Sequence, residues 1–444
     1  MKETFEALCC QAADYYRLGM MEQAVAAYLQ ACELQDDNPD LYNNLGSACD
    51  NLGRREEAIR YFRKAVELDP GYARAWFNLG LAWYNAGENG EAAAAYRKAL
   101  ECSPGYRSAW FNLGLALNRL GQCEEAIRCL RQADELEPGD SNVWFNLGLA
   151  WQKAGNLREA IASFRRAAGL NPADWESWLF AGNLCKELGD SQAAVDAYLQ
   201  VYKHQPDSSK LCYEIGCLWT ELGHPDKAIP FLSKATQLDR FDHLAWQGLG
   251  NAWAAKGEIE TAIGYFQRSA EIEPGYAWAH FNTGVAWEKL GDYPKAIEYF
   301  HKALAISPQE QEILQSLSLN YERSGQWQEA MRWYEQLAEL NPSDAIVRNN
   351  LGFGYIRLGQ LDRALPHLEA ALAQGLHDHA NLNLGHCRLI QGQVPGAVEH
   401  YRASLRAFSP PAAFWQSLEG DFEYLAAQGV SRSTFDAAVK QLRA

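Results

Sequence analysis

Proline is scarce in this chain of 444 residues, and long apolar runs are missing altogether. The 16 prolines mostly stand at one recurring position, which indicates helices that end at regularly spaced turns. No apolar run approaches the roughly 20 residues that a membrane-spanning helix requires. The first residues, MKETFEALCCQAADYY, also lack the basic start and the apolar stretch of a secretory signal. We therefore expect a helical protein without a membrane segment.

Positive charge is also in short supply. Lys and Arg number 40 against 56 Asp and Glu, so the formal net charge is -16. Affinity for phosphate backbones comes from clustered Lys and Arg, and we expect neither a nucleic-acid nor a membrane partner. The 11 cysteines form no CxxC pair and no zinc-finger spacing. This favours buried free thiols in a reducing compartment, and hence a cytoplasmic protein.

Catalytic signatures are lacking as well. The sequence has no Walker loop, no G-x-S-x-G, no HExxH and no Cys–His pair in a recognisable context. His377, His379 and His386 are close in sequence, but metal sites normally need three or four converging ligands, and spacing alone shows no such set. We expect a chain that is not an enzyme and that uses no cofactor and no metal.

What the sequence does contain is an octapeptide that recurs at a fixed interval. WFNLGLAW at 76–83 returns as WFNLGLAL at 110–117 and as WFNLGLAW at 144–151, each copy starting 34 residues after the last. Such a period is the signature of stacked structural repeats. If Trp76 is position 4 of a 34-residue unit, the register holds from Phe5 to about His377 without an insertion or deletion.

Four further positions of this unit are nearly invariant. Position 8 is usually glycine, position 15 is glycine, position 20 is alanine and position 32 is usually proline; in the third unit these are Gly80, Gly87, Ala92 and Pro104. Positions 4, 7, 8 and 11 form the stripe of one amphipathic helix, and positions 20, 24 and 27 form the stripe of a second. Glycine at 15 suits the turn after the first helix, and proline at 32 ends the second. The pattern predicts a helical hairpin.

The landmarks W-x2-L-G-x2-Y, A-x3-F and P resemble those of the tetratricopeptide repeat. This resemblance implies an all-α, right-handed α-solenoid superhelix of about twelve 34-residue hairpins, similar to that of O-GlcNAc transferases, with the first helices lining a concave face. We expect eleven in-register units over 5–377, a twelfth, slipped unit over 378–411, and capping helices over 412–444. Two helical segments are predicted in this cap, Phe414–Gln428 and one from Ser431 or Ser433 to Leu442. Arg240 replaces the proline that ends the seventh unit, and proline is again missing before the twelfth, so either junction is ordinary degeneration or a hinge.

Position 6 points to the inner face of the first helix and carries a row of asparagines. These are Asn44, Asn78, Asn112, Asn146, Asn282, Asn350 and Asn383. An amide offers both a donor and an acceptor, which suits the backbone of an extended peptide whatever its sequence. The alternative is that asparagine is simply common at this position in such repeats.

Apolar and basic residues flank this row. Positions 5 and 9 of the third to fifth units are Phe77, Leu81, Phe111, Leu115, Phe145 and Leu149. A contiguous apolar strip on a groove usually marks an interaction surface, unless packing between neighbouring units buries it. Position 13 carries Arg119 and Lys153 among other basic residues, which either favour an acidic or phosphorylated partner or are ordinary solvated helix ends.

The first functional hypothesis is a non-enzymatic scaffold that binds an extended peptide or disordered segment of a partner protein in its concave groove. The second is a regulatory or substrate-selecting subunit of a separate enzyme. The third is a structural scaffold that associates with itself through apolar groove or cap surfaces, with Phe414 and Trp415 as candidates. The sequence names neither the partner nor its preferred motif.

Overall fold

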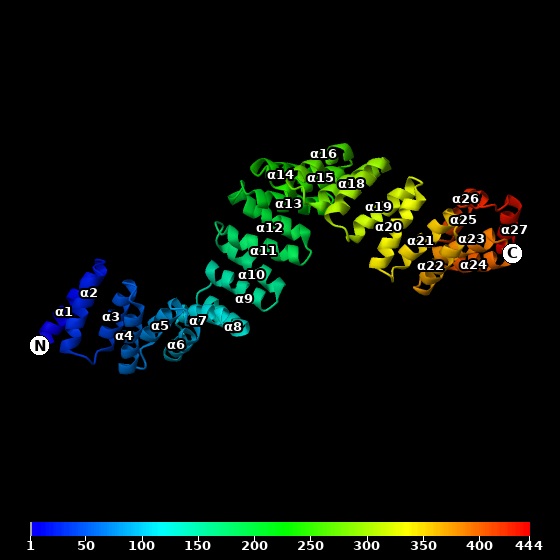
Figure 1. Cartoon of the computed structure of the whole chain (residues 1–444). Helices are drawn as coiled ribbons and strands as arrows, with labels where there is room; N and C mark the ends of the chain where they lie inside the picture. The colour runs from blue at the N-terminus through cyan, green and yellow to red at the C-terminus, as the bar shows by residue number, and fades with distance from the viewer. Residues whose placement is uncertain (1) are drawn as a thin grey trace. The chain divides into compact units, whose positions relative to one another are not determined.

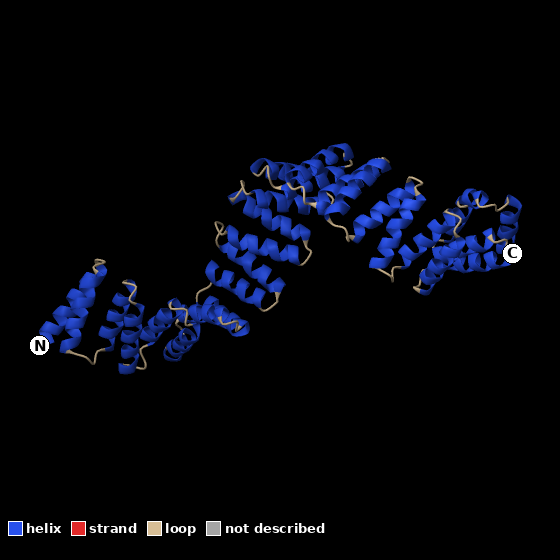
Figure 2. Cartoon of the chain, viewed as in Figure 1, coloured by secondary structure: helices blue, strands red, loops and turns tan. Residues whose placement is uncertain are grey.

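In the computed structural model, residues 2–444 are described, and they fold into helices α1 to α27 without any strand (Figures 1 and 2). The chain divides into two compact units, Met1–Leu211 and Cys212–Ala444. The division falls within α13 (Ser209–Glu221) rather than at either irregular junction. The predicted all-α fold is confirmed.

The first unit is a row of helical hairpins in which each helix packs against the next. Its helices are α1 (Lys2–Arg17), α2 (Met21–Leu34), α3 (Pro39–Asn51), α4 (Arg55–Leu68), α5 (Ala73–Asn85), α6 (Asn89–Cys102), α7 (Arg107–Arg119), α8 (Cys123–Leu136), α9 (Ser141–Lys153), α10 (Leu157–Leu170), α11 (Trp175–Glu187) and α12 (Ser191–His204). The odd-numbered helices are the first helices of the predicted hairpins, and the even-numbered ones are the second.

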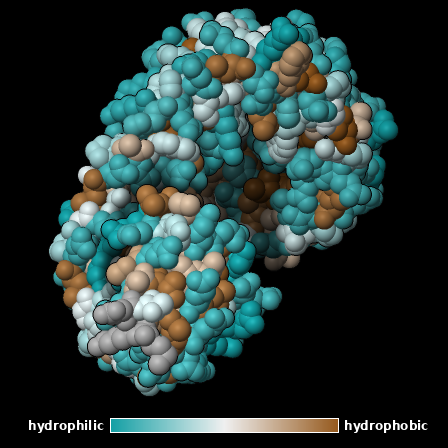
Figure 3. Space-filling view, turned by 90° about the vertical axis from the view of Figure 1, so that its left-hand side faces the viewer, coloured by the Kyte–Doolittle hydropathy of each residue, from teal (hydrophilic) through white to brown (hydrophobic). Residues whose placement is uncertain are grey.

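The second unit continues the same pattern and ends in three additional helices. Its helices after α13 are α14 (Pro225–Leu238), α15 (His243–Lys256), α16 (Ile259–Ile272), α17 (Ala277–Lys289), α18 (Tyr293–Ile306), α19 (Gln311–Arg323), α20 (Trp327–Leu340), α21 (Ala345–Arg357), α22 (Leu361–Ala373), α23 (His379–Ile390), α24 (Val394–Ala407), α25 (Pro411–Gly420), α26 (Phe422–Ala427) and α27 (Arg432–Arg443). No helix of the described chain has both the length and the apolar composition of a membrane span. Hydrophilic residues cover most of the face in Figure 3, with hydrophobic ones scattered among them.

Small residues allow the two helices of each hairpin to approach closely. A Cβ atom added to Gly80 would lie 2.7 Å from the ring of Tyr96, and Tyr96 and Ala92 are fully buried. Gly87, at the end of the first helix, has a φ of 87°, which L side chains rarely adopt. The predicted roles of positions 8, 15 and 20 are therefore confirmed at this hairpin.

Tryptophan at position 4 ties the first helices α5, α7 and α15 to the turns that precede them. Trp76 Nε1 donates a hydrogen bond to the carbonyl oxygen of Pro70, 2.9 Å away, and Trp246 Nε1 donates to that of Arg240, 3.0 Å away. Although Arg240 replaces proline, α14 still ends at Leu238, and Asp239 is extended (φ -133°, ψ 96°). The local turn thus keeps its form without proline.

The C-terminal cap differs in part from its prediction. The first predicted segment begins earlier, at Pro411, and is divided into α25 and α26 at Asp421. Glycine is a poor helix former, and Gly420 stands directly before the break. The side chain of Asp421 also turns away to bond His386. Phe414 of α25 and Phe435 of α27 are fully buried, so the cap shares the apolar core of the last repeats.

Candidate peptide-binding surface

The asparagine row of the first unit lies on first helices α3, α5, α7 and α9. Asn44 is exposed, and Asn78, Asn112 and Asn146 are half-buried. Asn112 Nδ2 donates to the carbonyl oxygen of Ser108, and Asn146 Nδ2 donates to that of Asn142, both at 2.8 Å. These bonds within the helix fix the orientation of both amides. Each Oδ1 atom is left without a hydrogen-bond partner among the described residues.

Asn78 is held by the neighbouring repeat instead. Its Nδ2 donates to Oδ1 of Asn43, 2.8 Å away, which joins α5 to α3. Asn43 is fully buried, and its own Nδ2 has no partner in the described chain. Asn78 therefore resembles Asn112 and Asn146: its Nδ2 donates a hydrogen bond within the chain, and its Oδ1 has no partner among the described residues.

The phenylalanines of position 5 lie partly inside the hairpins. The ring centroid of Phe77 is 5.7 Å from that of Tyr96 and 4.9 Å from that of Tyr106. Phe145 meets the edges of Phe164 and Phe180, both at 5.5 Å. All six apolar residues expected to form the strip are half-buried: Phe77, Leu81, Phe111, Leu115, Phe145 and Leu149. Packing between repeats therefore covers part of this strip and leaves part accessible.

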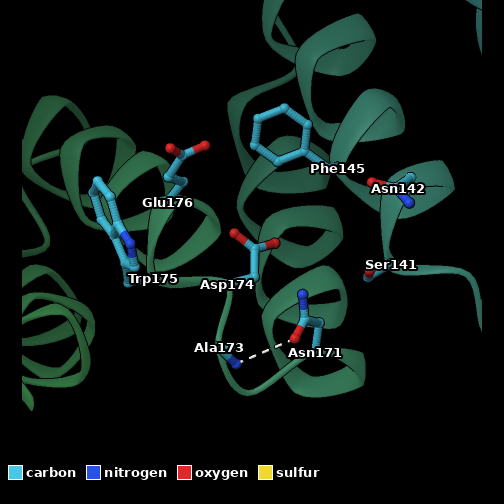
Figure 4. A pocket seen from close by; sticks show the side chains of 8 residues that line it. All are labelled: Ser141, Asn142, Phe145, Asn171, Ala173, Asp174, Trp175 and Glu176. Carbon is cyan, nitrogen blue, oxygen red and sulfur yellow. Dashed lines mark hydrogen bonds between the residues drawn. The ribbon is translucent and has the colours of Figure 1, made fainter. Parts of the chain in front are cut away.

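A cavity of about 360 Å³ opens beside Phe145, between the start of α9 and the turn that leads into α11. Figure 4 shows Phe145 from α9 together with Asp174, Trp175 and Glu176 around this space. The remaining lining residues are Ser141, Asn142, Asn171 and Ala173. The sequence pattern did not predict this cavity, because the predicted surface consists of positions 5, 6, 9 and 13, whereas most of the cavity lining comes from positions 1, 2 and 31–34. The available signal was Trp175, an aromatic residue at position 1.

The basic residues of position 13 have partners within the chain. The guanidinium of Arg119 lies 3.9 Å from the ring centroid of Tyr84, and Lys153 Nζ donates to the carbonyl oxygen of Asn118 at 3.0 Å. Both pairs join consecutive first helices. Stabilisation of the stack accounts for these two side chains without an acidic ligand.

The asparagine row behaves differently in the second unit. Asn282 is half-buried, and Asn350 Nδ2 lies 3.5 Å from the hydroxyl of Tyr334. Asn383 is only 5% exposed, and its Nδ2 donates to Oδ1 of Asn349 at 2.9 Å. The expectation that Asn383 lies on an open groove is wrong, because it faces a cavity that α25 helps to enclose.

Three tyrosines that pack behind the first-unit surface have raised pKa values. Burial raises the pKa of Tyr96 and of Tyr106, so both phenols stay protonated. Burial also raises the pKa of Tyr72 to about 12, and its hydrogen bond to Asp40 adds to this effect. Among the described residues, no group of three His, Cys, Asp or Glu side chains is placed to hold a metal ion. The surface offers hydrogen bonds and apolar contact.

Comparison with known families agrees with the hairpin geometry. A family model described as tetratricopeptide repeat matches residues 50–107, 145–209, 213–277 and 354–412. Other models of the same repeat match residues 13–53, 107–150, 277–310 and 311–344. The chain belongs to the tetratricopeptide repeat family. This membership supports a protein-interaction scaffold.

Several solved structures are similar to this chain. The crystal structure of MamA is 25% identical to this chain, with a TM-score of 0.38. The match covers 40% of this chain and 96% of the MamA chain. YrrB, described as a TPR protein with an unusual peptide-binding site, is 25% identical with a TM-score of 0.37, covering 42% of this chain and 96% of its own. Yeast Tom70 is 15% identical with a TM-score of 0.38, covering 91% of this chain and 96% of its own. A comparison with the sequences of curated proteins finds no match.

Proposed function

We propose that this chain is a scaffold that binds an extended segment of a partner protein along α5, α7 and α9. The supporting observation is the orientation of Asn78, Asn112 and Asn146. Each amide donates to a carbonyl oxygen inside the chain, and each Oδ1 atom keeps its accepting capacity. The backbone N–H groups of an extended peptide are the donors that such a row of acceptors fits.

The accessible parts of the phenylalanine and leucine side chains add affinity without a strict sequence requirement. Phe111 and Leu115 are half-buried, so a bound segment would remove further apolar surface from water. Because the rings already pack against the hairpin, little side-chain freedom remains to be lost on binding. Such a preorganised surface lowers the entropic cost of association.

The test uses peptides selected on the purified full chain from a library of short random sequences. The variant in which Asn78, Asn112 and Asn146 are all replaced by alanine should bind these peptides about tenfold or more weakly, as the loss of several hydrogen bonds predicts. Methylation of the peptide backbone nitrogens should weaken binding to the unaltered chain by a similar factor. Fluorescence anisotropy measures both effects.

Asn156→Ala is the matched control, since Asn156 is exposed in the turn before α10 and its side chain makes no capping bond. It should bind the selected peptides as well as the unaltered chain does. Circular dichroism should show equal helix content in all variants. Equal peptide affinity in the triple variant and the unaltered chain would contradict the proposal.

A further inference from the structure

The second unit contains a cavity that the repeats alone do not form. It has a volume of about 550 Å³ and lies between α21, α23 and the cap helix α25. Its lining residues are Asn349, Asn350, Phe353, His379, Leu382, Asn383, Gln416, Ser417, Gly420 and Asp421. The volume falls within the range of about 300–1,000 Å³ that is usual for ligand sites. Four of these residues belong to the cap, so the site depends on a segment outside the repeat pattern.

A fixed carboxylate supplies the charge of this cavity. Oδ2 of Asp421 lies 3.1 Å from Nε2 of His386, and Nδ1 of His386 lies 2.9 Å from the hydroxyl of Tyr401. His386 is fully buried, whereas the side chain of Asp421 is 25% exposed. The buried imidazole thus holds one carboxylate oxygen, and the other has no hydrogen-bond partner among the described residues. No Lys or Arg lines the cavity to neutralise it.

Two buried amides complete the site. Asn349 is 8% exposed and Asn383 is 5% exposed, and a single hydrogen bond joins them. Within the described chain, that bond leaves the N–H groups of Asn349 and the Oδ1 atom of Asn383 without partners, although both residues line the cavity. Neither atom is among the fully buried polar atoms that lack a partner in the described chain, so both remain open to an occupant of the cavity. Oδ1 of Asn383 is thus an acceptor for a donor group of such an occupant.

We propose that this cavity binds a positively charged side chain, lysine or arginine, of a partner segment. The ammonium or guanidinium group would donate to Asp421 and to Oδ1 of Asn383, and the aliphatic stem would lie against Phe353 and Leu382. Charge-assisted hydrogen bonds to a partly buried carboxylate are stronger than neutral ones. The proposed site is separate from the surface on α5, α7 and α9 and does not depend on it.

The probes are fluorescein-labelled, N-acetylated heptapeptides of glycine and serine with arginine, lysine, glutamine or glutamate at the centre. The full chain should bind the arginine and lysine peptides about tenfold or more tightly than the other two, as expected for a hydrogen-bonded charge. A glutamine peptide with a free N-terminal amine distinguishes a chain terminus from a side chain as the source of the cation. Tight binding of that peptide alone would contradict the side-chain assignment.

Two variants test the site directly. Asp421→Asn should abolish the preference for arginine, whereas Glu423→Gln, which removes an exposed carboxylate two residues away, should retain it. Gly420→Leu fills the cavity from α25, where an added Cβ meets no atom within 4 Å, and should block the arginine peptide without loss of helix content. If Asp421→Asn unfolds the cap, Gly420→Leu decides the outcome.

The proposal is overturned if the arginine peptide binds no better than the glutamine peptide. It is equally overturned if a folded Gly420→Leu variant binds arginine as well as the unaltered chain. The triple asparagine variant of the first unit should keep the preference for arginine, so failure of the two proposals can be told apart.

Discussion

The same register positions behave differently in the middle of the first unit and at the end of the second. In the fourth repeat, Phe111 and Asn112 at positions 5 and 6 are half-buried. In the twelfth, Leu382 and Asn383 at the same positions are buried, and so is His386 at position 9. The neighbour accounts for this, because another repeat follows α7 and α8, whereas the cap helices follow α24. The position within the repeat sets the direction of a side chain, and the next element in the stack sets its exposure.

The amides of position 6 are held in two ways, and the two regions share one of them. Asn112 bonds a carbonyl of its own helix, whereas Asn383 bonds Asn349 on the preceding first helix. Asn78 also bonds Asn43 on the preceding first helix, so pairing between repeats occurs in the first unit as well. The two units also differ in histidine content, since His204 is the only histidine before residue 212.

The largest difference between the two regions is expected for ring deletion. Phe414→Ala should cost about 3–5 kcal/mol of local stability, because a fully buried ring is removed beneath the cap. Phe111→Ala should cost roughly half as much, because its ring is only half-buried. Hydrogen exchange followed by mass spectrometry on the full chain resolves the two regions. Equal losses at both sites would break the comparison.

Replacement of the glycine at position 8 gives a second comparison of the two regions. Gly148→Ala would place a Cβ 2.7 Å from the ring of Phe164, and Gly385→Ala would approach Tyr401 more closely still. Tyr401 is also held by its hydrogen bond to His386, so it yields less. We expect about 1–3 kcal/mol of destabilisation, greater at Gly385, from urea unfolding. Gly420→Ala is the control and should cause no destabilisation, since the added Cβ meets open space.

A smaller effect is expected for the arginines of position 13. Arg357 lies 5.0 Å from the ring centroid of Trp327 and 4.8 Å from that of Tyr424, whereas the exposed Arg119 lies over one ring among the described residues, that of Tyr84. Arg357→Gln should therefore cost about 1–2 kcal/mol, and Arg119→Gln about 0.5–1 kcal/mol. Urea unfolding measures both variants. A larger loss of stability for Arg119→Gln than for Arg357→Gln would show that the contact of Arg357 with Tyr424 of the cap adds no stability.

The smallest effect is an acid sensitivity confined to the second unit. Burial lowers the pKa of four half-buried histidines from the ordinary value of 6.5: His280, His301, His367 and His400. The unfolded chain then binds more protons than the folded one as pH falls, so their contribution is fully present above about pH 6.5 and is lost as pH falls through the folded pKa values.

Hydrogen exchange, corrected for intrinsic rates, should show weaker protection of α16 to α24 at about pH 5.5 than at about pH 8, with α3 to α10 unchanged. Replacement of the four histidines by glutamine is the control and should reduce this difference. Equal acid sensitivity of both units would assign it to carboxylates instead.

The 34-residue register by itself predicts most of the architecture. The glycines of positions 8 and 15 and the alanine of position 20 predict a close-packed hairpin. Only a small residue fits the approach at Gly80, and only glycine readily adopts the positive φ at Gly87. The direction of Asn112 follows from the same period. The orientation of its amide does not, because that depends on a hydrogen bond to Ser108.

The cap and the cavity beside it were decided by tertiary structure alone. His386 and Asp421 are 35 residues apart, and no periodicity relates them, since Asp421 lies where the repeats have ended. The sequence by itself determined that helical hairpins form and which side chains share a face, because these depend on local geometry repeated along the chain. The burial of Asn383, the division of the first cap helix and the carboxylate in the cavity depend on how a non-repeating segment folds back on the last repeats, and that is set by packing between distant residues.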